Sequence, residues 1–133
     1  MINKVTFAQR TREKYGDTVE QFAFRLCASV KTVEGWEKGK TPGQIHASLL
    51  NYAYKYELTL KHDAPEEFVK MNATQQINYL MKYYGESINS VATRLGLASY
   101  TLMRWKATHK ISPSAQRLLY EAAAHPNNFQ LIN

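Results

Sequence analysis

An internal repeat constrains the fold of this chain more than any other feature. Segments 15–53 and 84–122 align without a gap at an offset of 69 residues. Ten aligned pairs are identical: Tyr15/Tyr84, Gly16/Gly85, Ala23/Ala92, Arg25/Arg94, Leu26/Leu95, Thr32/Thr101, Trp36/Trp105, Leu49/Leu118, Leu50/Leu119 and Ala53/Ala122. Such a repeat predicts two copies of one structural unit. We expect domains at 1–60 and 73–133, joined by a linker at 61–72 that contains a short helix.

Apolar spacing and capping residues predict the same helices in both copies. Polar N-caps, glycines after helices and prolines at first helical positions mark the ends. No alternating strand pattern is found, so the predicted fold class is all-α, with four to five helices in each domain. The expected helices are 5–15, 19–26, 30–37 and about 42–56 in the first copy. In the second copy they are 73–84, 88–95, 99–106 and 113–124, and residues 127–133 carry no clear signal.

The composition is that of a mildly basic globular chain. The 133 residues carry a formal net charge of +6, and 44% are hydrophobic. No segment is apolar enough to span a membrane or to act as a signal peptide, so we expect no membrane partner and a cytoplasmic location. Cys27 is the one cysteine, which excludes an internal disulfide framework.

Two short helices joined by a tight turn are, by spacing alone, a weak indication of DNA binding. The segment 18–42, TVEQFAFRLCASVKTVEGWEKGKTP, adds a specific pattern. It resembles the helix-turn-helix of the lambda-repressor/Cro family, also called the xenobiotic-response-element type. The string TVxxWExGKxP at 32–42 resembles antitoxin-type members in particular. The resemblance covers about residues 6–56, and more loosely 75–124. It implies two tandem helix-turn-helix domains.

In that family the second helix of the motif lies in the major groove, and its early residues reach the bases. The positions carried over are Ser29, Val30, Lys31 and Glu34 in helix 30–37, and Ser99, Tyr100 and Arg104 in helix 99–106. Arg104 is the foremost candidate, because arginine can bond guanine through two atoms. Lys31 is the second. For Glu34, a solvated charge is the alternative to contact with a cytosine amino group.

Other positions are candidates for contact with phosphates, which set register and salt dependence. Lys38, Lys40, Lys106, His109 and Lys110 follow the two recognition helices. Thr18 and Ser87 cap the helices before them, where free backbone N–H groups can hold a phosphate. The alternative for the basic residues is an ordinary solvated loop.

The resemblance also implies a structural ion pair between Arg12 and Glu37. The matching residues in the second copy are Met81 and Lys106, so both partners change together. Loss of the pair is expected to free Lys106 for phosphate.

The remaining aromatic residues and the cysteine are interpreted as structural. Trp36 and Trp105 share a helix face with Val33 and Leu102, which predicts burial. Tyr52, Tyr54 and Tyr56, with Leu60 and Phe68, are expected to form a contact between the repeats or a dimer surface. Cys27 is expected to be a small buried residue.

Enzymatic activity is not expected. The four histidines lie far apart, and there is no metal-ligand spacing, phosphate-binding glycine loop or nucleophile elbow. No cofactor and no metal are expected. The first hypothesis is a sequence-specific regulator, a repressor that binds double-stranded DNA, with homodimerisation possible. The alternative is an antitoxin or adaptor-type module that binds a protein partner, with at most one repeat on DNA.

Overall fold

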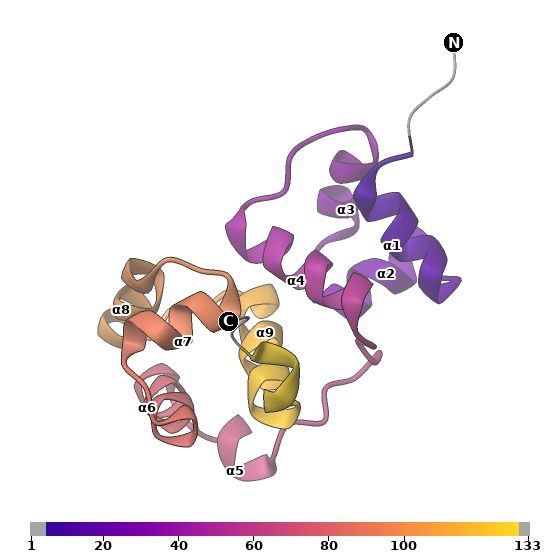
Figure 1. Cartoon of the computed structure of the whole chain (residues 1–133). Helices are drawn as coiled ribbons and strands as arrows, with labels where there is room; N and C mark the ends of the chain where they lie inside the picture. The colour runs from indigo at the N-terminus through magenta and orange to yellow at the C-terminus, as the bar shows by residue number, and fades with distance from the viewer. Residues whose placement is uncertain (1–4, 131–133) are drawn as a thin grey trace. The chain divides into compact units, whose positions relative to one another are not determined.

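The computed structural model describes residues 5–130, which form nine α-helices, one 3₁₀ turn and no strand (Figure 1). The all-α prediction is confirmed for this part of the chain. The helices separate into two compact units, with the boundary between Lys61 and His62. Residues 62–72, assigned to a linker in the sequence analysis, lie in the second unit.

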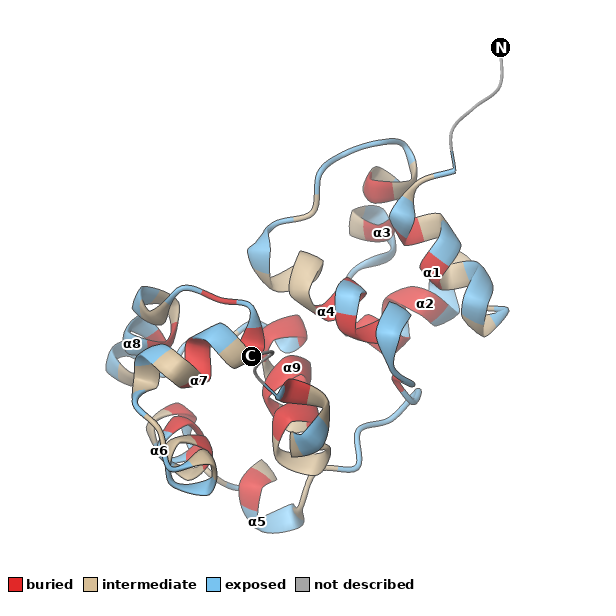
Figure 2. Cartoon of the chain, viewed as in Figure 1, coloured by how far each residue is buried: buried red, intermediate tan, exposed pale blue. Residues whose placement is uncertain are grey.

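The first unit contains four helices, and its core lies where they meet (Figure 2). Phe22, Val33 and Leu50 are at most 1% exposed, and they come from three different helices. Trp36 is also buried, as expected, and its ring stacks on His46 with centroids 4.9 Å apart. The helices are α1 Phe7–Tyr15, α2 Val19–Leu26, α3 Val30–Glu37 and α4 Gln44–Lys55.

The second unit repeats this order after one additional short helix. Its helices are α5 Glu66–Val69, α6 Ala73–Tyr84, α7 Ile88–Leu95, α8 Ser99–Thr108 and α9 Pro113–Ala124, followed by the 3₁₀ turn η1 Pro126–Phe129. The starts of α2, α3 and α4 recur in α7, α8 and α9 at the repeat offset of 69 residues. Trp105 is buried, as Trp36 is in the first unit.

Local capping explains most of the helix ends. Thr18 and Gln21 form a reciprocal capping box at α2, and Asn72 and Gln75 form another at α6. Ser29 and Ser112 cap α3 and α9 through their side-chain oxygens. These ends agree with the sequence prediction because each signal is complete within four residues.

Helix ends differ from the prediction in α1, α4 and α8, and α1 begins at Phe7 rather than at residue 5. Helix α4 begins at Gln44 after Gly43, not at Pro42 with Thr41 as its cap. Helix α5 has Pro65 at its N-cap and no side-chain cap, because Asp63 pairs with His125 at 2.9 Å instead. Helix α8 extends to Thr108. The 3₁₀ turn η1 orders residues 127–129, and Phe129 is buried, 5% exposed; residues 131–133 of that tail lie outside the described part.

Cys27 was also predicted wrongly. It is exposed and ends α2 in the left-handed region at φ 55°, where the second unit has Gly96 at φ 72°. A residue at this position must turn the chain sharply, and the turn directs its side chain into solvent rather than into the core.

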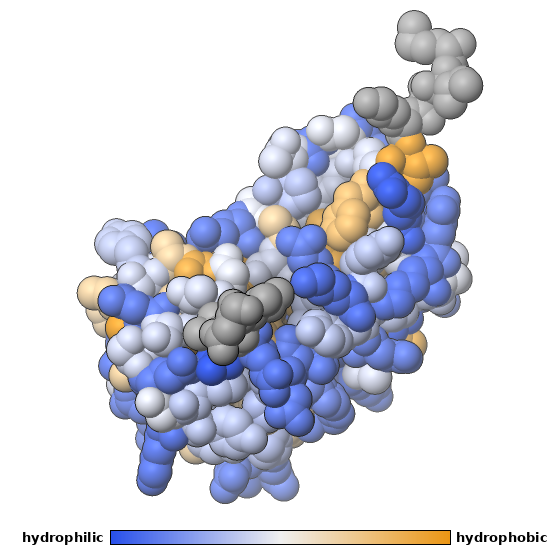
Figure 3. All heavy atoms as spheres, viewed as in Figure 1, coloured by the Kyte–Doolittle hydropathy of each residue, from blue (hydrophilic) through white to orange (hydrophobic). Residues whose placement is uncertain are grey.

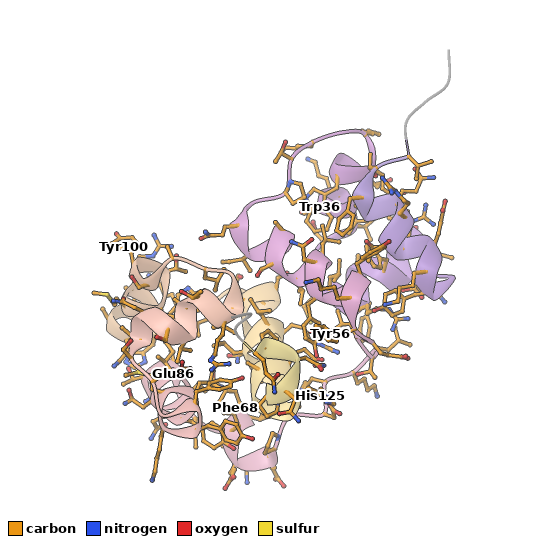
Figure 4. All side chains as sticks on the ribbon, in the orientation of Figure 1. Trp36, Tyr56, Phe68, Glu86, Tyr100 and His125 are labelled. Atoms are coloured by element: carbon orange, nitrogen blue, oxygen red, sulfur yellow. The ribbon has the colours of Figure 1, made fainter. Side chains whose placement is uncertain are left out.

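The aromatic residues that were expected to form a contact surface lie partly in the core and partly at the surface. Phe68 is fully buried and packs edge-on against Tyr79 and Tyr120 of its own unit, so it does not form part of an exposed surface (Figure 4). Tyr52 is buried, whereas Tyr54 is 50% exposed.

Candidate nucleic-acid interface

Helix α3 in the first unit has one face exposed to solvent. Val33 and Trp36 turn inward, which leaves Val30, Lys31 and Glu34 exposed. The Ser29 hydroxyl accepts a hydrogen bond from the Thr32 amide at 3.1 Å. Ser29 therefore caps the helix with the same oxygen that was predicted to reach a base.

Helix α8 presents larger side chains at the equivalent face. Tyr100 is 68% exposed and points away from the second unit (Figure 4), and Met103 is 52% exposed. The Arg104 guanidinium carbon lies 6.0 Å from the centroid of the Tyr100 ring, one helical turn away. Ser99 is half-buried, which leaves Tyr100 and Arg104 as the exposed members of the predicted set.

The basic loop after α3 is held against that helix. The Lys40 amide donates to the Gly35 carbonyl at 2.9 Å, and the Lys40 side-chain stem passes over Gly35, which has no side chain of its own. A hollow of about 500 Å³ opens beside this contact, and its lining includes Lys31, Lys38 and Lys40. The loop thus brings Lys38 and Lys40 next to Lys31 on the exposed face of α3.

The cations after α8 are placed differently. Lys106 is half-buried, and its ammonium donates to the Asn78 side chain on α6 at 3.1 Å. His109 ends the helix in the left-handed region at φ 57° and is exposed, as is Lys110. That Lys106 contacts phosphate stays a prediction, and Asn78 engages one of its three N–H groups.

The two predicted phosphate positions at helix starts are capping residues. The Thr18 hydroxyl accepts from the Gln21 amide at 3.1 Å, and the Ser87 hydroxyl accepts from the Ser90 amide at 3.4 Å. Both residues are exposed. A phosphate at either helix start would use the remaining backbone N–H groups.

The expected ion pair between Arg12 and Glu37 is formed. Arg12 donates to both carboxylate oxygens, through Nε at 2.9 Å and Nη2 at 2.7 Å, and to the Asp17 carbonyl at 3.0 Å. The equivalent place in the second unit is a shallow, largely apolar hollow of about 460 Å³ whose lining includes Met81, Ile88 and Met103. The two units therefore differ in charge at one location.

A second charged cluster in the first unit was not predicted from the sequence. The Arg25 guanidinium lies 4.3 Å from the Tyr15 ring centroid, pairs with Asp17 at 2.8 Å and donates to the Leu58 carbonyl at 2.6 Å. The Tyr15 hydroxyl donates to the Tyr56 carbonyl at 2.9 Å. The cluster fastens the end of α4 to α1 and α2, and we call it the tyrosine–arginine clamp.

The second unit has the same clamp. The Arg94 guanidinium lies 4.3 Å from the Tyr84 ring centroid, pairs with Glu86 and donates to the Phe129 carbonyl at 2.9 Å. Burial raises the pKa of Tyr84 to about 12 and also raises that of Tyr15. The repeat could have predicted the clamp, since two of its ten identical pairs are Tyr15/Tyr84 and Arg25/Arg94. The residues of a buried charged cluster depend on one another, so both copies retain them together.

No protein-family model, curated protein or solved structure matches this chain. Its function must therefore be argued from its own geometry.

Among residues 5–130, no three histidine, cysteine or acidic side chains gather in a way that could hold a metal ion. No helix in that range has both the length and the apolar character needed to cross a membrane.

Proposed function

We propose that the chain is a sequence-specific double-stranded DNA-binding regulator of transcription, a repressor acting in the cytoplasm. Helix α3 and residues 99–106 of α8 would enter the major groove. The observation that carries the proposal is the repeated pair of helices, α2–α3 and α7–α8. Each pair is joined by three residues, 27–29 or 96–98, and each second helix exposes one face.

The two exposed faces suggest different tasks. Arg104 supplies two parallel N–H donors for guanine, and the adjacent Tyr100 ring limits the positions of its guanidinium. The first unit offers Lys31 and Val30 for bases, and a group of lysines for phosphates. We therefore expect the second unit to provide most of the base discrimination and the first unit most of the salt-dependent affinity.

The test is binding of the purified protein to its own upstream DNA and to random DNA of the same length, over a series of salt concentrations. Arg104→Ala is expected to reduce the preference for the upstream DNA by about 1–3 kcal/mol while leaving weak, salt-sensitive binding. Lys38→Ala is expected to weaken binding to both DNAs and to lower the salt slope by about 1. The matched control is Lys70→Ala, which removes an exposed charge from α5 of the second unit.

Equal, weak binding of both DNAs by wild type and Arg104→Ala would refute base reading. A failure to bind any DNA would refute the proposal as a whole.

A protein-interaction module of antitoxin or adaptor type is the second candidate. It is favoured by the exposed Tyr100 and Met103 on α8, next to an apolar hollow. Tyrosine, methionine and arginine are the residues enriched in the centres of protein interfaces. In this case Tyr100→Ala would abolish binding to a protein partner, or formation of a homodimer, and leave DNA affinity unchanged.

A further inference from the structure

A hollow of about 290 Å³ lies in the first unit between the start of α1, the loop after α3 and the middle of α4. Its apolar lining includes Phe7, Trp36, Ala47 and Leu50. Apolar surface also reaches the outside of this unit in Figure 3. An engineered apolar cavity of about 150 Å³ holds benzene, so this hollow has room for a fused ring or a ring with a short side chain.

The repeat explains why the first unit has this space. The residues equivalent to Phe7 and Ala47 are Gln76 and Gln116. In the second unit the Gln116 amide donates to Gln76 Oε1 at 2.9 Å, so two long side chains span the distance between α6 and α9. Ala47 has no side chain beyond Cβ and cannot do the same from α4. The hollow is therefore a specific difference between the two copies.

The lining combines aromatic walls with one charge. Trp36 is 4% exposed, and its ring is fixed by the core (Figure 4). The Phe7 ring packs against Tyr54 at a tilt of 53°, with centroids 5.2 Å apart, which restricts the Phe7 ring. Among the described residues that line the hollow, Lys40 is the charged one, and no aspartate or glutamate of residues 5–130 accompanies it there. A ligand that matches this lining has a flat apolar body and one negative group.

We propose that this hollow is a binding site for a small aromatic carboxylate. The ring lies between Phe7, Trp36 and Leu50, and the carboxylate pairs with the Lys40 ammonium. Pockets for small molecules are lined in this way, mostly apolar with a few polar groups that fix orientation. Lys40 is anchored for this role through its backbone bond to Gly35.

Lys40 and Thr41 also line the basic hollow beside α3. A bound carboxylate would occupy a lysine that is proposed to contact phosphate, and so would act as an effector of DNA binding. This consequence rests on the proposed function, whereas the binding site itself does not.

The site is tested without DNA, by ¹H–¹⁵N NMR titration of the full chain with three probes. Indole-3-acetate carries both ring and carboxylate, indole-3-acetamide carries the ring alone, and acetate carries the carboxylate alone. We expect indole-3-acetate to shift the Trp36 indole and Lys40 amide signals, and to bind at least five-fold more tightly than the amide. Acetate is expected to shift neither signal at the same concentrations.

Two variants separate the ring site from the charge. Ala47→Leu fills the hollow and is expected to abolish ring binding. Lys40→Met keeps the aliphatic stem and is expected to remove the preference for the carboxylate over the amide. Lys55→Met, an exposed residue of α4 outside the lining, is the matched control and should retain the preference.

Three results would overturn the proposal. These are no binding of either indole probe to wild type, equal affinity of wild type for acid and amide, and undiminished ring binding by a folded Ala47→Leu variant. Lys40 is exposed, so Lys40→Met tests the charge even if Ala47→Leu does not fold.

Discussion

The ion pair between Arg12 and Glu37 allows a quantitative test, because the second unit lacks it. Arg12→Met and Glu37→Lys introduce the residues that the second unit has at these positions, Met81 and Lys106. The side chains of Arg12 and Glu37 are only 20% and 14% exposed, and two hydrogen bonds join them. Each single change therefore leaves one charged group partly desolvated without its partner.

The expected cost follows from this burial. Breaking a fully buried pair costs about 3–5 kcal/mol, and an exposed pair contributes at most about 1 kcal/mol. For a pair that water reaches at one edge, we expect each single change to cost about 2–3 kcal/mol. The double variant removes both charges of the pair, and should cost about 2 kcal/mol. The coupling energy is then about 2–4 kcal/mol, at or above the upper end for residues in contact.

The chain provides a fluorescence probe for each unit. Its two tryptophans are Trp36 in the first unit and Trp105 in the second, and both are buried. A Trp105→Phe background leaves Trp36 to report on the first unit during urea unfolding. In a unit of this size, a change of about 1 kcal/mol shifts Tm by about 4–8 °C, so the single variants are well resolved.

An exposed arginine on the same helix, Arg10, provides the control. Arg10→Met makes the same substitution at an exposed site of α1, and should stay within about 0.5 kcal/mol of wild type. If the double variant costs as much as the two single changes together, the pair has no coupling energy. Loss of one partner would then carry no penalty that loss of the other relieves.

Three further predictions concern single residues. Burial lowers the pKa of His46 below 6.5, so the unfolded chain takes up the proton first and stability falls as pH drops below about 6.5; His46→Phe should reduce this fall in urea unfolding between pH 7 and 5, and an unchanged pH profile would contradict it. Burial raises the pKa of Tyr84 from 10.0 to about 12, so the contribution of Tyr84 to stability is present below pH 10 and is lost as pH rises towards 12. Tyr84→Phe should flatten the decline in stability at alkaline pH that Trp105 fluorescence reports, and an equally steep decline would argue against burial of the hydroxyl. Gly35→Ala places a Cβ in ordinary contact, 3.5 Å from the Lys40 stem, and should stabilise the first unit by about 0.5–1 kcal/mol in thermal unfolding. Because the added methyl lies on the face proposed to meet DNA, the affinity for DNA should fall. A gain in DNA affinity alongside the gain in stability would place α3 outside the groove.

Helices whose signals are local could be predicted from the sequence. Thr18 with Gln21 and Asn72 with Gln75 complete their capping boxes within four residues, so the starts of α2 and α6 were correct. The start of α4 was wrong because Pro42 gives a strong local signal in a loop that is held by Lys40 against α3. The repeat held the right answer, since the Ser112–Pro113 start of α9 aligns with Gly43–Gln44.

Contacts between distant residues were harder to predict. Asp63, two residues before the α5 N-cap Pro65, has the kind of side chain that caps helices, but its partner His125 lies 62 residues away, and nothing near Asp63 in the sequence indicates this contact. The Arg12–Glu37 pair was predicted only because a family resemblance supplied its partner. Exposure on α3 and α8 followed from helical spacing, whereas the engagement of Lys106 by Asn78 depends on how α6 packs on α8. Neither copy of the repeat, taken alone, contains a sequence pattern that predicts the hollow beneath Lys40.

The tyrosine–arginine clamp decides where the chain can be divided for experiments on each unit. Helix α4 ends at Lys55, yet the carbonyls that serve Tyr15 and Arg25 belong to Tyr56 and Leu58. A fragment cut at the helix end would leave Arg25 with Asp17 but without the Leu58 carbonyl, whereas one ending at Lys61 retains the whole clamp. The same logic requires a fragment of the second unit to extend beyond Phe129, and the boundary between the units places its start at His62. Affinity tags therefore belong after the last residue rather than in place of the final turn.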